Sequence, residues 1–319
     1  MIARIMVKSP RFVLPSPPSI APLPAVLRPK TEPEGSADAG FLAGAALAWL
    51  HRIACDEHPV GGLWRQRMAL ANAAALMPLL GRAEDEAALR DAVMLTRPGD
   101  DPGPAGQVVL AWRRLAERQT QLVDDWWLSA SAVLGLSVDD RMSDVYAVAE
   151  RLARGEANPI AAAAEIVAVS MKFRPDAELL ALWLADAMLA ARLKWPRPVP
   201  LLALEIRRKD LRAAPEHLDG TGRWLATCAL AYARAAARAS DLHAELCRRA
   251  GRLVAAAPKM RAKHADEGML ILMMEDAQTA RSATDAMSER AARRLFERLE
   301  AFGAARELTG RSTFRLYGL

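Results

Sequence analysis

The sequence predicts an all-α protein: an irregular bundle of about ten or more helices, with a disordered Pro-rich N-terminal arm and an extended C-terminal tail. Three observations predict this fold class. Alanine, the strongest helix former, supplies 66 of the 319 residues. Aromatic residues make up only 5%, and glycine and proline lie mostly between apolar stretches, which argues against β-sandwiches, collagen-like repeats and disulfide scaffolds. Beyond the arm, apolar residues recur at helical spacing.

The first 36 residues form a separate zone that contains eight prolines. Proline removes a backbone donor and interrupts helices, so we expect residues 1–36 to be a disordered arm. A single helical domain is expected over residues 37–303. Residues 304–319 are expected to form an extended tail that docks on this body.

The helices of the first half are bounded by turn and capping residues. A cluster of proline, glycine and aspartate at residues 96–104 predicts a loop. Pro159 suits the first turn of a helix. We expect helices over residues 38–56, 63–80, 84–95, 105–118 and 139–154, with others opening at residues 124 and 159.

The second half contains the most apolar segment. A helix from Pro175 to Trp195 is apolar almost all round, which predicts that it is the buried centre of the fold. Asp241 is expected to cap a separate helix. Further helices are expected over residues 222–240, 241–257, 266–276 and 284–302.

Charge and cysteine usage bear on location and partners. The arm carries a net charge of +3 and the tail +2, so the body between them is neutral and a nucleic-acid partner is not favoured. Three widely spaced cysteines indicate a reducing compartment. The apolar run Ala39–Leu50 is too short to span a bilayer, and the N-terminus lacks a signal-peptide core. We therefore expect a cytoplasmic protein without a membrane partner.

The familiar motifs for phosphate loops, dinucleotide binding, zinc proteases and serine hydrolases do not occur. The leading hypothesis is a non-enzymatic helical binding or scaffold protein with a protein partner and no cofactor. The alternative is a metal- or carboxylate-dependent enzyme of unknown reaction. A third hypothesis is a nucleic-acid accessory protein that uses its basic tails. The sequence does not indicate an oligomeric state.

Two histidine–cysteine pairs offer a possible metal site. His51 and Cys55 are four residues apart on one expected helix, and His243 and Cys247 repeat this spacing on another. Residues four apart share a helix face, so the four side chains could bind Zn²⁺ if the helices are neighbours. The alternative interpretation is that the cysteines are small core residues.

Asp186 is the candidate catalytic residue. It lies within the helix expected to be buried, where a carboxylate needs a partner or has a raised pKa. Alternatively, Glu178, Asp186 and Arg192 lie on a narrow hydrated edge of that helix.

The C-terminal tail places four large apolar side chains in the last six residues: Phe314, Leu316, Tyr317 and Leu319. Left exposed, they would promote association. We expect the tail to dock on the protein's own helices, and otherwise to anchor a partner chain.

Four segments resemble an uncharacterised bacterial family, the domain-of-unknown-function family 1403. They are residues 97–104 (RPGDDPGP), 124–127 (DDWW), 184–203 (LADAMLAARLKWPRPVPLLA) and 310–319 (GRSTFRLYGL). The resemblance extends over nearly all of the chain after the arm. It implies a bacterial cytoplasmic protein and brings no activity or catalytic residue with it.

Overall fold

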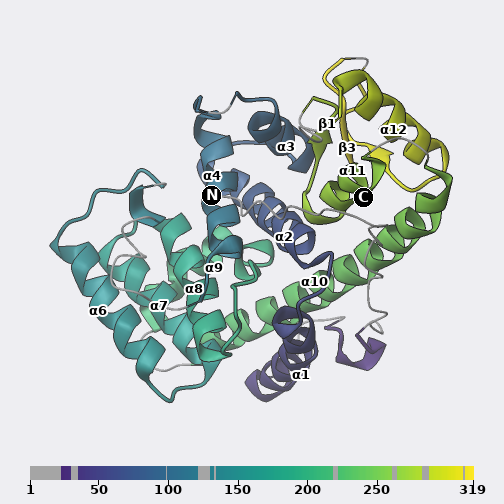
Figure 1. Cartoon of the computed structure of the whole chain (residues 1–319). Helices are drawn as coiled ribbons and strands as arrows, with labels where there is room; N and C mark the ends of the chain where they lie inside the picture. Colours follow the sequence, from purple (N-terminus) through teal and green to yellow (C-terminus); the bar gives the residue numbers. More distant parts are fainter. Residues whose placement is uncertain are drawn as a thin grey trace.

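The computed structural model describes residues 23–29, 35–97, 99–120, 130–132, 134–217, 222–260, 264–281, 287–311 and 313–319. Within these residues the chain is predominantly helical, with three short strands (Figure 1). The prediction of an all-α, multi-helix fold is confirmed. The helix expected to open at residue 124 lies outside the described residues.

The α-helices are α1 Ser36–Cys55, α2 Gly61–Leu76, α3 Glu86–Met94, α4 Gly103–Glu117, α6 Asp140–Arg154, α7 Pro159–Phe173, α8 Glu178–Arg192, α9 Arg208–Ala213, α10 Arg223–Ala256, α11 Ala265–Met274 and α12 Glu289–Ala301. Short 3₁₀ turns are η1 Ala25–Leu27, η2 Met77–Leu80, η3 Leu202–Leu204, η4 Ala214–His217 and η5 Ala257–Lys259. The strands are β1 Gln278–Thr279, β2 Arg306–Glu307 and β3 Leu316–Gly318.

Side chains cap several helix starts. The carboxylate of Asp139 accepts a hydrogen bond of 2.9 Å from the Met142 backbone N–H at the start of α6. The side chain of Asn158 accepts from the Ile160 N–H at 2.9 Å, with Pro159 in the first turn of α7. These bonds satisfy donors that have no partner within the helix, so local sequence alone places these starts.

Helix α10 is the longest of the described helices and runs diagonally across the view in Figure 1. Its 34 residues span about 50 Å at 1.5 Å per residue. The prediction of two helices separated at Asp241 is wrong. No proline interrupts the segment, and Asp241 lies on the helix surface, where its carboxylate accepts two 2.7 Å hydrogen bonds from Arg28. An aspartate inside a helix costs only a few tenths of a kcal/mol, which this segment tolerates.

Helix α8 packs against α7, which lies between α8 and α6 in the view of Figure 1. The α8 residues from Leu180 to Ala190 are all buried, as the apolar pattern predicted. Two buried tryptophans link neighbouring helices by hydrogen bonds. Trp183 of α8 donates to the Ala111 carbonyl of α4, and Trp224 of α10 donates to the Ala164 carbonyl of α7.

Part of the expected disordered arm is ordered. Residues 23–29 contain η1, Leu23 is only 2% exposed, and Arg28 pairs with Asp241. Proline prevents an α-helix here but permits a 3₁₀ turn, so the prediction is wrong for this segment. The arm residues 1–22 and 30–34 lie outside the described part.

The C-terminal end combines α11, α12 and a three-stranded antiparallel sheet. Strand β3 lies between β1 and β2, with Tyr317 opposite both Gln278 and Glu307. The tail, residues 304–319, therefore contains two of the three strands, β2 and β3. In the described part, no helix combines the length and apolar character needed to cross a bilayer.

Candidate functional site

The two histidine–cysteine pairs form on adjacent helices. The Cys55 sulfur lies 3.6 Å from His51 Nε2 on α1, and the Cys247 sulfur lies 3.6 Å from His243 Nε2 on α10. Their immediate partners differ, however. His51 Nδ1 accepts a 3.1 Å hydrogen bond from the Trp195 indole, so its lone pair is already used.

His243 instead meets His58, which follows α1. The His243 Nε2 and His58 Nδ1 atoms are 3.3 Å apart, and the rings pack edge to face. Burial raises the pKa of the Cys247 thiol to about 11, which disfavours the thiolate that a metal requires. Among the described residues, no group of three or more His, Cys, Asp or Glu side chains could hold a metal ion. The structure thus does not bring the four candidate ligands together.

This buried histidine pair predicts a loss of stability in mild acid. Burial, His58 and Arg65 together lower the pKa of His243 from 6.5 to about 3. Below pH 6.5 the unfolded chain therefore binds a proton that the folded chain excludes, and His243 lowers the free energy of unfolding by up to about 1.4 kcal/mol per pH unit. His243→Gln is expected to remove this contribution, so its free energy of unfolding should fall less than that of wild type between pH 6.5 and 4.5 in urea titrations. His264→Gln, at a half-buried histidine that contacts Glu267 at 3.0 Å, is the control, and equal slopes in both variants would contradict the prediction.

Asp186 is buried, at 1% exposure, which excludes the hydrated edge for this residue. Its carboxylate accepts hydrogen bonds from the backbone N–H groups of Leu201 at 2.8 Å and Leu202 at 3.1 Å. Burial raises the pKa of Asp186 to about 7, although these hydrogen bonds act against the rise. The carboxylate therefore holds the turn after Pro200, and this contact accounts for its position without a substrate.

Replacing Asp186 separates its charge from its role as an acceptor. Asp186→Leu leaves two buried N–H groups without a partner and is expected to cost about 2–5 kcal/mol. Asp186→Asn retains an acceptor oxygen and is expected to lie within about 1 kcal/mol of wild type at pH 7. Because folding raises the pKa from 3.8, Asp186 contributes stability that is lost as pH rises from 4 to 7, opposite in sign to the contribution of His243. The Asn variant lacks this contribution, so the difference in free energy of unfolding between wild type and Asp186→Asn should fall as pH rises, and urea unfolding of both proteins across this range checks it.

The four apolar tail residues separate into two sets. Leu316, Tyr317 and Leu319 are at most 1% exposed, whereas Phe314 is 76% exposed. The Tyr317 ring packs against Phe296 of α12, with centroids 5.0 Å apart. Gly318 permits the close approach of β3, since a Cβ there would lie 2.7 Å from the Asp276 carbonyl oxygen.

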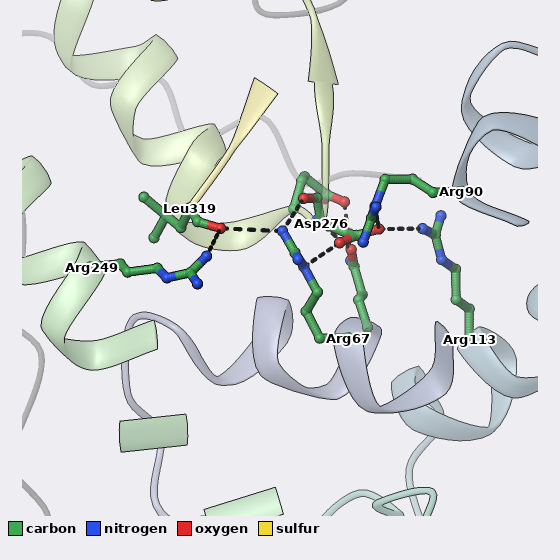
Figure 2. Close-up of polar contacts among 8 residues, drawn as sticks. Arg67, Arg90, Arg113, Arg249, Asp276 and Leu319 are labelled. Atoms are coloured by element: carbon green, nitrogen blue, oxygen red, sulfur yellow. Dashed lines mark hydrogen bonds and ion pairs between the residues drawn. The ribbon is translucent and has the colours of Figure 1, made fainter. Parts of the chain in front are cut away.

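A cluster of arginines surrounds Asp276 beside this strand (Figure 2). Asp276 is 1% exposed and forms ion pairs with Arg67, Arg90 at 3.0 Å and Arg113 at 3.5 Å. These arginines come from α2, α3 and α4, so one carboxylate joins three helices to the C-terminal sheet. We refer to Arg67, Arg90, Arg113 and Asp276 as the arginine cluster.

The end of β3 is held in the same region. The main-chain oxygen of Leu319 accepts hydrogen bonds from Arg249 at 2.9 Å and Arg67 at 3.3 Å (Figure 2). Arg67 thereby connects Asp276 with Leu319. Sequence reasoning missed this cluster, although an aspartate two positions after the apolar run of residues 268–274 was a usable signal.

Phe314 lies in the hairpin loop between β2 and β3, and this loop is fixed at several points. The Glu307 carboxylate accepts from the backbone N–H groups of Thr309 at 2.8 Å and Gly310 at 2.7 Å. Arg311 forms a 2.6 Å ion pair with Asp91 of α3. Phe314 itself has a φ of 55°, a left-handed conformation that a bulky residue rarely adopts. The loop thus holds an aromatic side chain in solvent.

Comparison with protein families identifies one match. The model of the family described as "Protein of unknown function (DUF1403)" matches residues 15–319. A comparison with the curated proteins found no match. The match covers the arginine cluster, the hairpin loop and the turn held by Asp186. Of the segments that suggested the resemblance, residues 124–127 lie outside the described part.

Proposed function

The chain belongs to the DUF1403 family, and from its surface we propose that it is a non-enzymatic helical binding protein that recognises another protein. The observation that carries this proposal is Phe314. An exposed Phe forgoes about 1.5–3 kcal/mol of burial, and here a fixed loop keeps it exposed. Rigid aromatic anchors of this kind dominate protein interfaces, because little conformational entropy is lost when they are buried.

The surroundings of Phe314 suggest the chemistry of the partner. Arg306 and Arg315 are exposed on the same hairpin. A partner that presents an apolar pocket with acidic residues at its rim would complement this surface. We also propose a bacterial and cytoplasmic setting. Its support is the three cysteines, which are all free thiols, as a reducing compartment would keep them.

A photo-crosslinking amino acid in place of Phe314 tests this proposal in cells. We expect it to capture a specific protein, whereas the same amino acid at Phe41, which is 67% exposed on α1, should not capture it. With the purified partner, Phe314→Ala should weaken binding at least tenfold and change the free energy of unfolding by less than about 0.5 kcal/mol. Equal capture from both positions, or unchanged affinity of Phe314→Ala, would contradict the proposal.

A further inference from the structure

A polar cleft lies on a different part of the surface, after α8. Its volume is about 580 Å³, within the range of small-molecule sites. The wall is formed by the turn of residues 194–197, by α6, and by residues that follow α1 and α4. Its polar and charged lining includes Glu57, Thr120, Glu150, Arg154, Lys194 and Arg197.

The turn of residues 194–197 has a lysine where the backbone is left-handed. Helix α8 ends in the hydrogen-bond pattern of a Schellman motif, with Trp195 N donating to the Ala190 carbonyl at 2.9 Å and Lys194 N to the Ala191 carbonyl at 3.2 Å. Lys194 occupies the left-handed position, at a φ of 54°. Glycine is the usual residue there, because a Cβ is strained in this conformation.

Two other turns of this chain show the usual choice. After α12, Gly303 has a φ of 63° and the same two types of hydrogen bond close the helix. After η2, Gly81 at 68° does likewise. A lysine at such a position retains strain that glycine would remove. Strain of this kind is found where a side chain has a task besides folding.

Hydrogen bonds from two neighbouring segments also hold the turn of residues 194–197 in place. The Trp195 indole donates to His51, and the Pro196 carbonyl accepts from the Thr120 N–H at 3.1 Å. Trp195 is 1% exposed, whereas its neighbours Lys194 and Arg197 are exposed. Two cationic side chains are therefore presented from a fixed backbone.

Two cations of this wall form no ion pair within the described residues. Neither Lys194 nor Arg197 has a carboxylate within 4.0 Å there. Nearby Arg65, 8% exposed, donates only to the backbone carbonyls of Ala54 at 2.8 Å and Gly61 at 3.3 Å. Burial and the charge of Arg197 lower the pKa of Arg65 to about 10, so the two guanidinium groups repel each other. An anion beside Arg197 would relieve this repulsion.

We propose that the cleft binds a small molecule through an oxyanion, a phosphate or a carboxylate, held between Lys194 and Arg197. Thr120 contributes a hydroxyl, whereas Arg154 on the α6 side already pairs with Glu150 at 3.5 Å. The Thr120 Oγ1 atom is buried and has no hydrogen-bond partner among the described residues, so a ligand oxygen can satisfy it. The carboxylates of Glu57 and Glu150 also line the cleft and repel a bound anion, so a ligand with a low negative charge fits the cleft better than a highly charged one. This inference is independent of Phe314 and its protein partner.

Calorimetric titration of the full chain with inorganic phosphate, and separately with acetate, tests the proposal at constant ionic strength. The double variant Lys194→Gln, Arg197→Gln should bind at least tenfold more weakly than wild type. The matched control is Lys172→Gln, Arg252→Gln, which removes the same charge at two exposed positions and should bind within twofold of wild type. Tighter binding of phosphate would assign the ligand to phosphate esters, and tighter binding of acetate to carboxylates; both support an oxyanion site.

A second variant separates binding from folding. Lys194→Gly relieves the left-handed strain, so its melting temperature should equal or exceed that of wild type while its affinity for the tighter-binding probe falls at least threefold. Failure of wild type to bind either probe, or equal affinities of the double variant and its control, would overturn the proposal. Wild-type affinity in Lys194→Gly would overturn the role of Lys194.

Discussion

Asp276→Asn is expected to lower the free energy of unfolding by about 3–5 kcal/mol, because the substitution leaves buried charge without a counterion. Arg67, Arg90 and Arg113 all pair with this carboxylate, and their side chains are no more than 14% exposed. An asparagine has nearly the same shape but cannot neutralise them. Urea unfolding at pH 7 measures the loss.

The control for this prediction is a surface ion pair. Arg151 and Glu165 are 2.7 Å apart, with side chains 63% and 39% exposed, so solvent screens their attraction. Glu165→Gln should therefore cost less than about 1 kcal/mol. Adding Arg90→Met to Asp276→Asn should recover part of the stability, because it removes one of the stranded charges. A loss below about 1 kcal/mol for Asp276→Asn would contradict the role of the arginine cluster.

Tyr317→Ala is expected to cost about 3–5 kcal/mol, since it opens a cavity between β3 and α12. Tyr317 is 1% exposed and packs on Phe296. Phe314, three residues earlier, is 76% exposed, and its replacement by alanine should change stability by less than about 0.5 kcal/mol. Thermal and urea unfolding of the two variants compares an inward and an outward aromatic from one hairpin.

The same pair of variants distinguishes docking from partner binding. Tyr317→Ala should destabilise the isolated protein, whereas Phe314→Ala should weaken only the complex. If Tyr317→Ala melts like wild type, then β3 contributes little to the fold. In that case the tail would act mainly on other molecules.

Features that depend on neighbouring residues were predictable from the sequence. Asp139 caps α6, Asn158 and Pro159 begin α7, and the apolar pattern of α8 marked it as buried. The spacing of four residues also placed each histidine beside its cysteine. These features follow from the geometry of a single helix, so a short segment contains all the information that they require.

Features that join distant segments were decided by the tertiary structure. His243 contacts His58 and not His51. The four-residue spacing of histidine and cysteine on each helix does not specify which histidine His243 meets. Asp241 lies within α10 and pairs at the surface with Arg28, 213 residues away in sequence. Asp276 collects arginines from three helices.

By itself, then, the sequence determined the all-α class, most helix positions and the buried character of α8. Tertiary structure decided which polar side chains meet, which tail residues are buried and which cations of the described residues form no ion pair. The physical reason is range. Helix propensity and capping act within about four residues, whereas burial and charge pairing depend on which surfaces the packed helices bring together.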